Sequence, residues 1–428
     1  MSDTIFAPAT VPGKSAVAMV RISGPMAFEV AERLTGAIVA PRRASLRWLR
    51  DPQSGDRLDQ AIVLGFPGPG SFTGEDCVEL QTHGSGAVIR ALLATLAGFE
   101  GLRLAAPGEF SRRALMNNRL DLAQVEGLGD LLAAETSAQR RQAVGLLDGG
   151  LSALVGEWRG AVLRTLALVE ATIDFSDEEL PDDLVEVAMR DLVGPLDEMR
   201  RELDGAVASE RLREGFDVAL VGLPNAGKST LLNRLARRDV ALVSDQAGTT
   251  RDILEVRLDL RGLPVTVLDM AGLRDAEGIE AAGVERARLR ARAADLRVFL
   301  VEDDSDLAVL GVACEADDIV VRGKADLHDE PGVSGATGKG VDDLLGRISD
   351  VLSLRVTGGG AISHARQRQA TERALAALER GRGCLRLGDV ELAAEELRLA
   401  LASLDFLVGR VDVEAVLDVI FSSFCLGK

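Results

Sequence analysis

The stretch "GLPNAGKST" (residues 222–230) decides the fold of the segment around it. It matches G-x-x-x-x-G-K-[ST], in which backbone N–H groups surround phosphates, the lysine reaches them and the hydroxyl binds Mg²⁺. The apolar run "DVALV" precedes the loop, and "STLLNRLA" follows it with helical spacing. This context predicts a strand, a phosphate-binding loop, and a helix whose positive N-terminus points at the phosphates.

Further short apolar runs surround this loop and alternate with helical stretches. They are "FDVALVGLP" (216–224), "PVTVLDMAG" (264–272), "LRVFLVED" (296–303) and "DDIVVRGKAD" (317–326). Such alternation is typical of a doubly wound, Ras-like α/β unit, which we expect over residues 213–355.

The flanking segments have a different character. Residues 1–117 carry short Val- and Ile-rich runs broken by Gly and Pro, which predicts strands and hairpins of an α+β domain. Residues 118–212 and 356–428 carry apolar residues at helical spacing. We therefore expect one α-helical bundle domain in two parts, into which the α/β unit is inserted.

Composition excludes several classes of protein. The net charge of -18 gives no general attraction to nucleic-acid phosphates. The four cysteines form no CxxC pair and the three histidines are dispersed, so neither a disulfide framework nor a His/Cys metal centre is expected. The absence of an 18-residue apolar run or a signal-like start leads us to expect a cytoplasmic protein.

Two motifs after the loop predict contacts with Mg²⁺ and phosphate. "GTTRD" (248–252) offers Thr250 as a second Mg²⁺ ligand. "DMAG" (269–272) offers Asp269, which can hold Mg²⁺ through water, and the N–H of Gly272 for the γ-phosphate.

Two later motifs predict recognition of a guanine base. In "GKAD" (323–326), Asp326 can accept both N–H bonds of the guanine edge. "SGATGKG" (334–340) can place backbone N–H groups near the guanine carbonyl. These motifs, in this order and at the ends of expected strands, predict a GTPase.

The sequence departs from the usual GTPase motifs at three positions. Gly323 replaces Asn in N-K-x-D, so we expect weaker nucleotide binding, with guanine selectivity retained through Asp326. Met270 replaces Thr in D-T-A-G, which we interpret as a packing change. Leu273 stands where Ras-like GTPases have the water-orienting Gln.

Hydrolysis therefore needs another group to orient water. Glu280 is the first candidate and Glu285 the second, although a solvated acidic face would explain either from charge alone. Asn225 could help bind a monovalent cation where an arginine would otherwise place its charge.

Several stretches together resemble the MnmE (TrmE) family of bacterial tRNA-modification GTPases. Besides the motifs above, they are "PGKSAVAMVRISG" (12–24), "FTGEDCVELQTHG" (72–84), "PGEFSRRALMNNRLDLAQVEGLGDLL" (107–132), "IEAAGVERA" (279–287) and "FCLGK" (424–428). The resemblance implies modification at C5 of the tRNA wobble uridine, carried out with the FAD-dependent partner MnmG. It also implies an aminomethyltransferase-like, folate-binding N-terminal domain that forms the homodimer, and potassium-dependent hydrolysis.

The resemblance also implies site residues. The GTP-binding positions are Asn225, Ala226, Gly227, Lys228, Ser229, Thr230, Ser244, Asp245, Gln246, Ala247, Gly248, Thr249, Thr250, Asp269, Met270, Ala271, Gly272, Gly323, Lys324, Ala325, Asp326, Ser334, Gly335 and Ala336. The potassium ligands are Asn225, Ser244, Gln246 and Thr249, and the Mg²⁺ ligands are Ser229, Thr250 and, through water, Asp269. A formyltetrahydrofolate would contact Arg21, Glu79, Arg119 (usually Lys in the family) and Lys428.

The end of the chain, "FSSFCLGK" (421–428), is expected to be ordered. Val413, Val416, Ile420 and Phe424 form a helical stripe that would anchor it. We interpret Cys425 as a catalytic residue of the modification step, with a buried structural thiol as the alternative.

Two other functions compete with this interpretation. A regulatory GTPase of ribosome assembly would carry a similar α/β unit, although a basic RNA-binding appendage would then be expected. In the third interpretation, the N-terminal domain is a folate enzyme and the GTPase regulates it.

Overall fold

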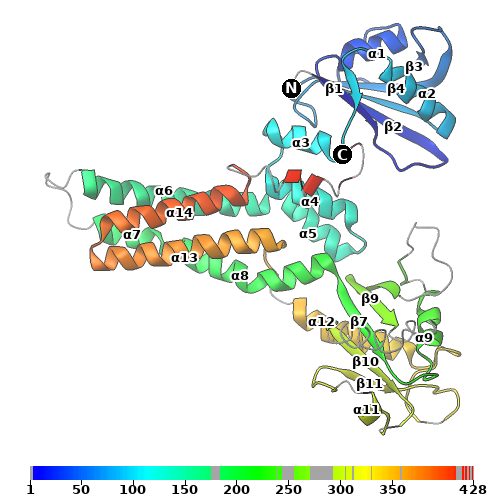
Figure 1. Ribbon diagram of the computed structural model, residues 1–428, viewed down its shortest axis with the longest axis vertical. Coiled ribbons are helices and arrows are strands. Elements are labelled where there is room, and N and C mark those ends of the chain that lie inside the picture. The colour runs from blue at the N-terminus through cyan, green and yellow to red at the C-terminus, as the bar shows by residue number, and fades with distance from the viewer. Residues whose placement is uncertain are drawn as a thin grey trace, which may run out of the picture. The chain divides into compact units, whose positions relative to one another are not determined.

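The computed structural model divides into two compact units, Met1–Gly129 with Asp405–Lys428, and Asp130–Leu404. It describes residues 3–174, 184–238, 240–242, 255–269, 293–303, 305–310, 313–328, 330–356, 359–410, 417, 418, 420, 421, 424 and 427. Figure 1 shows the elements of both units.

The first unit contains a six-stranded sheet in the order β3-β4-β5-β2-β1-β6. Its strands are β1 (Thr4–Pro8), β2 (Ser15–Ser23), β3 (Ser45–Arg50), β4 (Arg57–Phe66), β5 (Cys77–Gly84) and β6 (Leu102–Leu104). Its helices are α1 (Ala27–Thr35), α2 (Gly86–Ala97) and α3 (Glu109–Met116), and α4 (Leu122–Ala133) begins in it. The expectation of strands and hairpins in this part of the chain is confirmed.

Alternation along the strands builds the core of this sheet. Val20, Ile22, Val78 and Leu80 are buried among residues of α1 and α2. The residues between them, including Arg21 and Glu79, lie on the opposite face because successive strand side chains alternate in direction. The register pairs Arg21 with Glu79 across β2 and β5.

A buried arginine ties α3 to the chain start and to the loop before β5. Arg113 has no exposed side-chain surface, and its guanidinium donates to Glu75 Oε2, Glu109 Oε1 and Asp3 Oδ1, each at 3.0 Å. Burial alone would lower the pKa of Arg113, but hydrogen bonds with Glu75 and Glu109 reverse the effect and raise it. Ser23 Oγ also donates to Glu75, at 2.9 Å.

The described C-terminal residues pack into the first unit. Leu417, Phe421 and Phe424 form a buried cluster with residues of α4, with Ile420 packed against it. The predicted contribution of Ile420 and Phe424 is confirmed, Leu417 and Phe421 join them, and Val413 and Val416 lie outside the described residues. Gly427 lies so close to the Pro8 carbonyl that a Cβ there would overlap it. Gly427 therefore lies against the end of β1.

The second unit contains a helical bundle, visible in Figure 1 as helices lying side by side. Its helices are α5 (Ser137–Leu147), α6 (Gly150–Asp174), α7 (Leu184–Asp191), α8 (Val193–Glu214), α13 (Ala365–Leu387) and α14 (Val390–Leu407). Ion pairs Arg200–Glu379 (2.7 Å) and Arg368–Glu210 (2.9 Å) join α8 to α13. Helices that precede and follow the second sheet in sequence therefore pack together.

The second sheet has the order β11-β10-β7-β9-β8. Its strands are β7 (Phe216–Val221), β8 (Glu255–Leu260), β9 (Leu263–Asp269), β10 (Leu296–Val301) and β11 (Ile319–Arg322). All neighbours are parallel except β8 and β9. The four strands expected from apolar runs, and the helix expected after the loop, α9 (Lys228–Leu235), are confirmed.

Helices cover both faces of this sheet. Leu231 and Leu235 of α9 and Leu344 and Ile348 of α12 (Val341–Val356) share one core with the strands. On the opposite face, Ala219, Val221, Phe299 and Val301 form a second core, against which Leu307 of α11 (Asp306–Val309) packs. This arrangement matches the α/β expectation for the segment.

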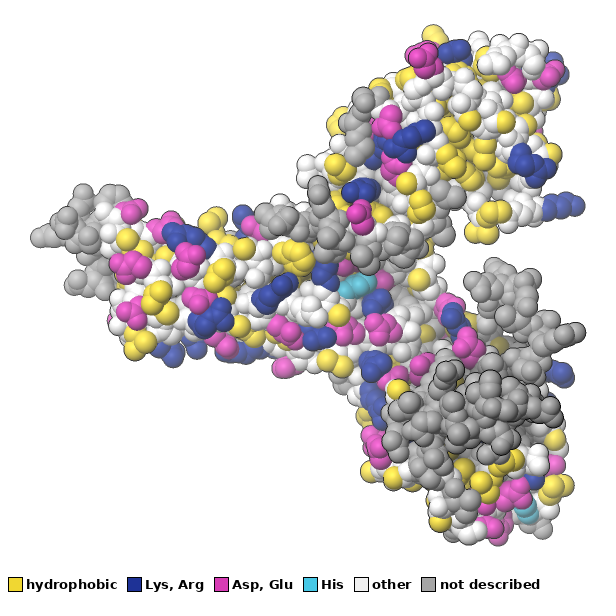
Figure 2. Space-filling view, in the orientation of Figure 1, with side chains coloured by type: hydrophobic (Ala, Val, Ile, Leu, Met, Phe, Trp, Pro, Cys, Tyr) yellow, Lys and Arg dark blue, Asp and Glu magenta, His cyan; other side chains and the backbone are white. Residues whose placement is uncertain are grey.

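Charged side chains are abundant on the surface of the described residues, as expected for a chain in which 27% of the residues are charged. On the face shown in Figure 2, basic and acidic side chains alternate along the helical bundle. Among the described residues, no helix is both long and apolar enough to span a bilayer.

We predict that Arg113→Met will destabilise the first sheet by about 3 kcal/mol, because it leaves buried carboxylates without a counter-charge. Amide hydrogen exchange of peptides from β2 and β5 should accelerate about a hundredfold. Arg112→Met is the control, because the Arg112–Asp418 pair is solvent-exposed and contributes at most about 1 kcal/mol. Equal exchange in the two variants would contradict the structural role of Arg113.

Candidate functional site

The loop between β7 and α9 has the backbone of a phosphate-binding loop. Asn225 (φ 64°) and Gly227 (φ 97°) are left-handed, and Gly227 caps the start of α9. The Lys228 ammonium is buried and donates to the carbonyls of Gly222 and Leu223, each at 2.8 Å. The lysine therefore lies inside the loop, where the positive end of α9 adds to its charge.

The predicted magnesium ligands Ser229 and Asp269 are adjacent. Ser229 is the second residue of α9, which follows β7, and Asp269 ends β9, which is parallel to β7. The Ser229 hydroxyl donates to Asp269 Oδ2 at 2.7 Å. A hydroxyl beside a carboxylate provides the hard oxygen donors that Mg²⁺ prefers, so these residues fit the ion.

The predicted base-reading motif follows β11 and touches the phosphate loop. The N–H of Gly323 donates to the Val301 carbonyl at 2.8 Å. A Cβ at Gly323 would lie 2.7 Å from the carbonyl oxygen of Ala226. In this chain the backbone of the base-reading loop therefore lies against the backbone of the phosphate loop. The residue at this place, Gly323, stands where N-K-x-D has an asparagine side chain.

The charged residues of this motif have different environments. Asp326 is exposed, and a hydrogen bond with the Ser334 hydroxyl holds the pKa of its carboxyl below the ordinary value. An ionised carboxylate is the form that accepts N–H bonds. Lys324 pairs with Glu302 at 2.6 Å.

Two residues that the sequence analysis did not single out hold these loops. Lys339 Nζ donates to the Ala325 carbonyl at 3.0 Å, and Arg234 Nε donates to the Gly335 carbonyl at 3.0 Å. Lys339 belongs to the "SGATGKG" motif, but Arg234 carries no signal beyond its place in a helix.

Several predicted residues lie outside the described part of the chain. They are Ser244, Asp245, Gln246, Ala247, Gly248, Thr249, Thr250, Met270, Ala271, Gly272, Leu273, Glu280, Glu285, Cys425 and Lys428.

The predicted folate residues Arg21 and Glu79 form an ion pair on one face of the first sheet. Arg21 Nη2 lies 2.9 Å from Glu79 Oε1, and their side chains are 11% and 17% exposed, so neither is an ordinary surface charge. The Arg21 guanidinium lies 5.0 Å from the ring centre of Phe72. Arg119 borders the same loop, because its Cγ would contact a Cβ at Gly74.

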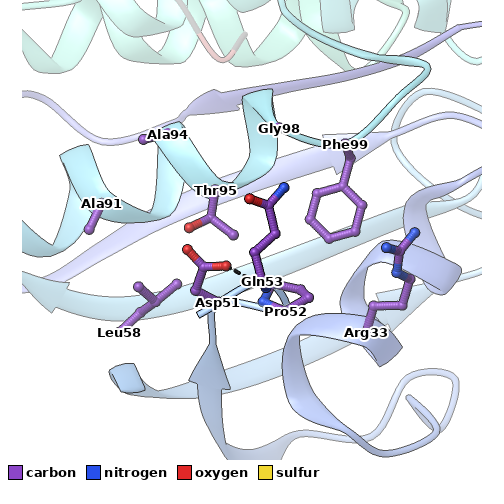
Figure 3. A pocket seen from close by; sticks show the side chains of 10 residues that line it. All are labelled: Arg33, Asp51, Pro52, Gln53, Leu58, Ala91, Ala94, Thr95, Gly98 and Phe99. Atoms are coloured by element: carbon purple, nitrogen blue, oxygen red, sulfur yellow. Dashed lines mark hydrogen bonds between the residues drawn. The ribbon is translucent and has the colours of Figure 1, made fainter. Parts of the chain in front are cut away.

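A cavity of about 320 Å³ lies elsewhere in the first unit, between the turn after β3 and α2 (Figure 3). Its lining includes Arg33, Asp51, Gln53, Thr95 and Phe99. Figure 3 shows the Asp51 carboxylate hydrogen-bonded to the Gln53 backbone. No predicted folate residue lines this cavity.

Comparison with known proteins identifies the family. The model described as "MnmE helical domain" matches residues 122–425, and "GTP-binding protein TrmE N-terminus" matches residues 4–119. The chain belongs to the MnmE (TrmE) family of tRNA modification GTPases. It is therefore an enzyme, a GTP hydrolase. The resemblance seen in the sequence is confirmed.

Curated relatives match along the whole chain. The tRNA modification GTPase MnmE of Dinoroseobacter shibae is 52% identical over 432 residues, with 100% of both chains covered. That of Cereibacter sphaeroides is also 52% identical, with the same coverage. These relatives leave no reason to retain the ribosome-assembly alternative.

Comparison with solved structures gives only weak similarity. A probable GTP-binding protein, engB, is 17% identical and aligns over 32% of this chain and 99% of its own, with a TM-score of 0.22. That similarity is too low to support a conclusion.

We predict that restoring asparagine at position 323 will weaken GDP binding about tenfold, because the new Cβ overlaps the Ala226 backbone. Gly323→Ala should weaken binding similarly, since the overlap involves only the Cβ. Gly346→Ala on α12 is the control, because its Cβ would have ordinary contacts. Titration with fluorescent GDP measures the effect, and tighter binding by Gly323→Asn would refute it.

Proposed function

We propose that this GTPase uses potassium-activated GTP hydrolysis to drive modification at C5 of the wobble uridine of certain tRNAs. The modification would install an aminomethyl or carboxymethylaminomethyl group with a folate one-carbon unit and the FAD-dependent partner MnmG. The observation that carries the proposal is the Lys228, Ser229 and Asp269 arrangement in a chain related to MnmE proteins over its full length.

The described loops support guanine nucleotide binding. Lys228 would bind the β- and γ-phosphates, and Ser229, Thr250 and, through water, Asp269 would hold Mg²⁺. Asp326, ionised at neutral pH, accepts the N–H groups of the guanine edge. When bound, Mg²⁺ neutralises charge on the phosphate oxygens during hydrolysis.

Hydrolysis relies on groups other than the glutamine that Leu273 replaces. Glu280 orients the attacking water. Asn225, Ser244, Gln246 and Thr249 would hold a potassium ion, and its positive charge would serve where other GTPases use an arginine finger. The left-handed Asn225 backbone supports this role, because it places the residue in the turn of the phosphate loop.

The first sheet is proposed to bind formyltetrahydrofolate through Arg21, Glu79, Arg119 and Lys428. The largely buried Arg21–Glu79 pair supports this, because a paired charge on a sheet face can exchange its partner for a polar ligand. Cys425 acts in the modification step. Gly427 against Pro8 supports a tail that ends near β1, the neighbour of the strand that carries Arg21.

We further propose four segments for the domain organisation. They are a folate-binding and dimerisation domain (1–117), a helical domain in two parts (118–212 and 356–428) and an inserted GTPase domain (213–355). Packing of α13 on α8 supports the insertion. The protein acts as a homodimer in the bacterial cytoplasm.

We predict that deleting the gene removes aminomethyl-type groups from wobble uridines, because the proposed reaction is the step that attaches the C5 carbon. Nucleoside mass spectrometry of bulk tRNA measures this. Wild-type complementation should restore the groups, and Lys228→Ala should not, because the phosphates lose their lysine. Intact modifications in the deletion strain would refute the proposed function.

We predict that GTP turnover will be at least about tenfold faster in potassium than in sodium chloride at equal ionic strength. Asn225→Gly is the variant of choice, because glycine tolerates the left-handed backbone while removing the amide. It should turn over GTP at the same slow rate in both salts. A wild-type enzyme indifferent to the cation would rule out the potassium site.

A further inference from the structure

The guanine-reading loop 334–336 rests directly on the first turn of α9. A Cβ at Gly335 would lie 2.5 Å from the backbone nitrogen of Leu231, so the loop backbone abuts the helix that begins at the phosphate loop. This close approach fixes the distance between the loop backbone and the helix. A further interaction is needed to fix the orientation of the loop peptide groups.

We propose that Arg234 is the positioning residue that holds this loop for recognition of the guanine 6-oxo group, an inference that rests on the proposed GTP-binding function. Its Nε donates to the Gly335 carbonyl at 3.0 Å, and its Nη2 donates to the carbonyl of Ala336. One guanidinium therefore bonds two successive carbonyls of the loop. A planar guanidinium can do this with fixed geometry, whereas a single ammonium cannot.

The direction of these bonds matters for the base. Arg234 restricts the orientation of the two peptide groups whose carbonyls it binds. Because a peptide group is planar, the N–H groups of those peptides are restricted too. Those N–H groups are the donors expected near the 6-oxo oxygen. Arg234 acts through the loop and does not touch the nucleotide.

Lys339 extends the same support to the second base loop. Its ammonium donates to the Ala325 carbonyl at 3.0 Å, beside Asp326. The Ala325 N–H in turn donates to the Val333 carbonyl at 3.3 Å. Helix α9, loop 334–336 and the "GKAD" loop are thus connected through backbone carbonyls held by two cationic side chains.

This arrangement explains how the chain manages without an asparagine at position 323. The Asn of N-K-x-D ties loops around the base through its side chain, and here Gly323 offers only backbone contact with Ala226. Arg234 and Lys339 supply side-chain ties from other elements. Arg234 therefore performs part of the loop positioning that the asparagine side chain performs in N-K-x-D.

The test compares two nucleotides that differ at the 6-oxo group. GDP carries it. 2-Aminopurine riboside diphosphate lacks it, together with the N1–H, but keeps the 2-amino group that faces Asp326. The loss of the N1–H bond to Asp326 is the same in every Arg234 variant, so a change in preference between variants reports on the 6-oxo group. Affinities of both for the full-length protein are measured by displacement of a fluorescent GDP. Arg234→Ala and Arg234→Lys are compared with Arg237→Ala, which removes an exposed arginine just after the same helix.

Wild type should prefer GDP clearly. In Arg234→Ala, GDP affinity should fall about tenfold while the affinity for the 2-aminopurine nucleotide stays the same, so the preference shrinks by that factor. Arg234→Lys should recover part of the loss, because it keeps the charge but bonds fewer carbonyls. Arg237→Ala should match wild type for both nucleotides.

Two outcomes would overturn the inference. In the first, Arg234→Ala binds both nucleotides as wild type does. In the second, Arg234→Ala and Arg234→Lys each lose affinity for both nucleotides by the same factor. The melting temperature of each variant identifies the second outcome as a general structural role. Failure of the proposed function is distinguishable, because wild type itself would then bind no GDP or show no preference between the nucleotides.

Discussion

The parallel pairing of β7 with β9 is the constraint on which the nucleotide site depends. It aligns Leu220, just before the phosphate loop, with Asp269 at the end of β9. Because parallel strands end at the same edge of a sheet, the carboxylate reaches the first turn of α9 and accepts the Ser229 hydroxyl bond. Lys228 is held one residue earlier by the loop carbonyls. One strand pairing therefore assembles the lysine, hydroxyl and carboxylate.

The same edge of the sheet brings the base loops against the phosphate loop. Glycine at 323 and at 335 permits backbone-to-backbone approach at two places, toward Ala226 and toward Leu231. These approaches leave no room for a side chain at either glycine, and the loops are also held by side chains from other elements. Arg234 and Lys339 provide these side chains, and the Asp326 carboxyl stays ionised beside the Ser334 hydroxyl.

The first unit is organised around a different long-range interaction. Arg113 joins α3, the chain start and the loop before β5 in one buried ionic network. That loop carries Phe72, which lies over Arg21, and Gly74, which borders Arg119. The described tail residues pack on α4, with Phe424 against Gly129. A buried network that tolerates no unpaired charge thus positions the surroundings of the proposed folate residues.

Features encoded within a few neighbouring residues were predictable from the sequence. Strands appear as apolar runs, the phosphate loop as glycine spacing and the family as a set of such motifs, because local backbone preference and side-chain period determine them. What only the tertiary structure decided were contacts between distant residues: Ser229 with Asp269, Arg113 with Asp3, and Arg234 with the 334–336 loop. These contacts depend on the order of the strands and on the distances between backbone segments. A local sequence pattern predicts neither of these properties. Gly323 shows the difference: the sequence marks a missing asparagine, and the fold shows the Ala226 backbone close to where its Cβ would lie.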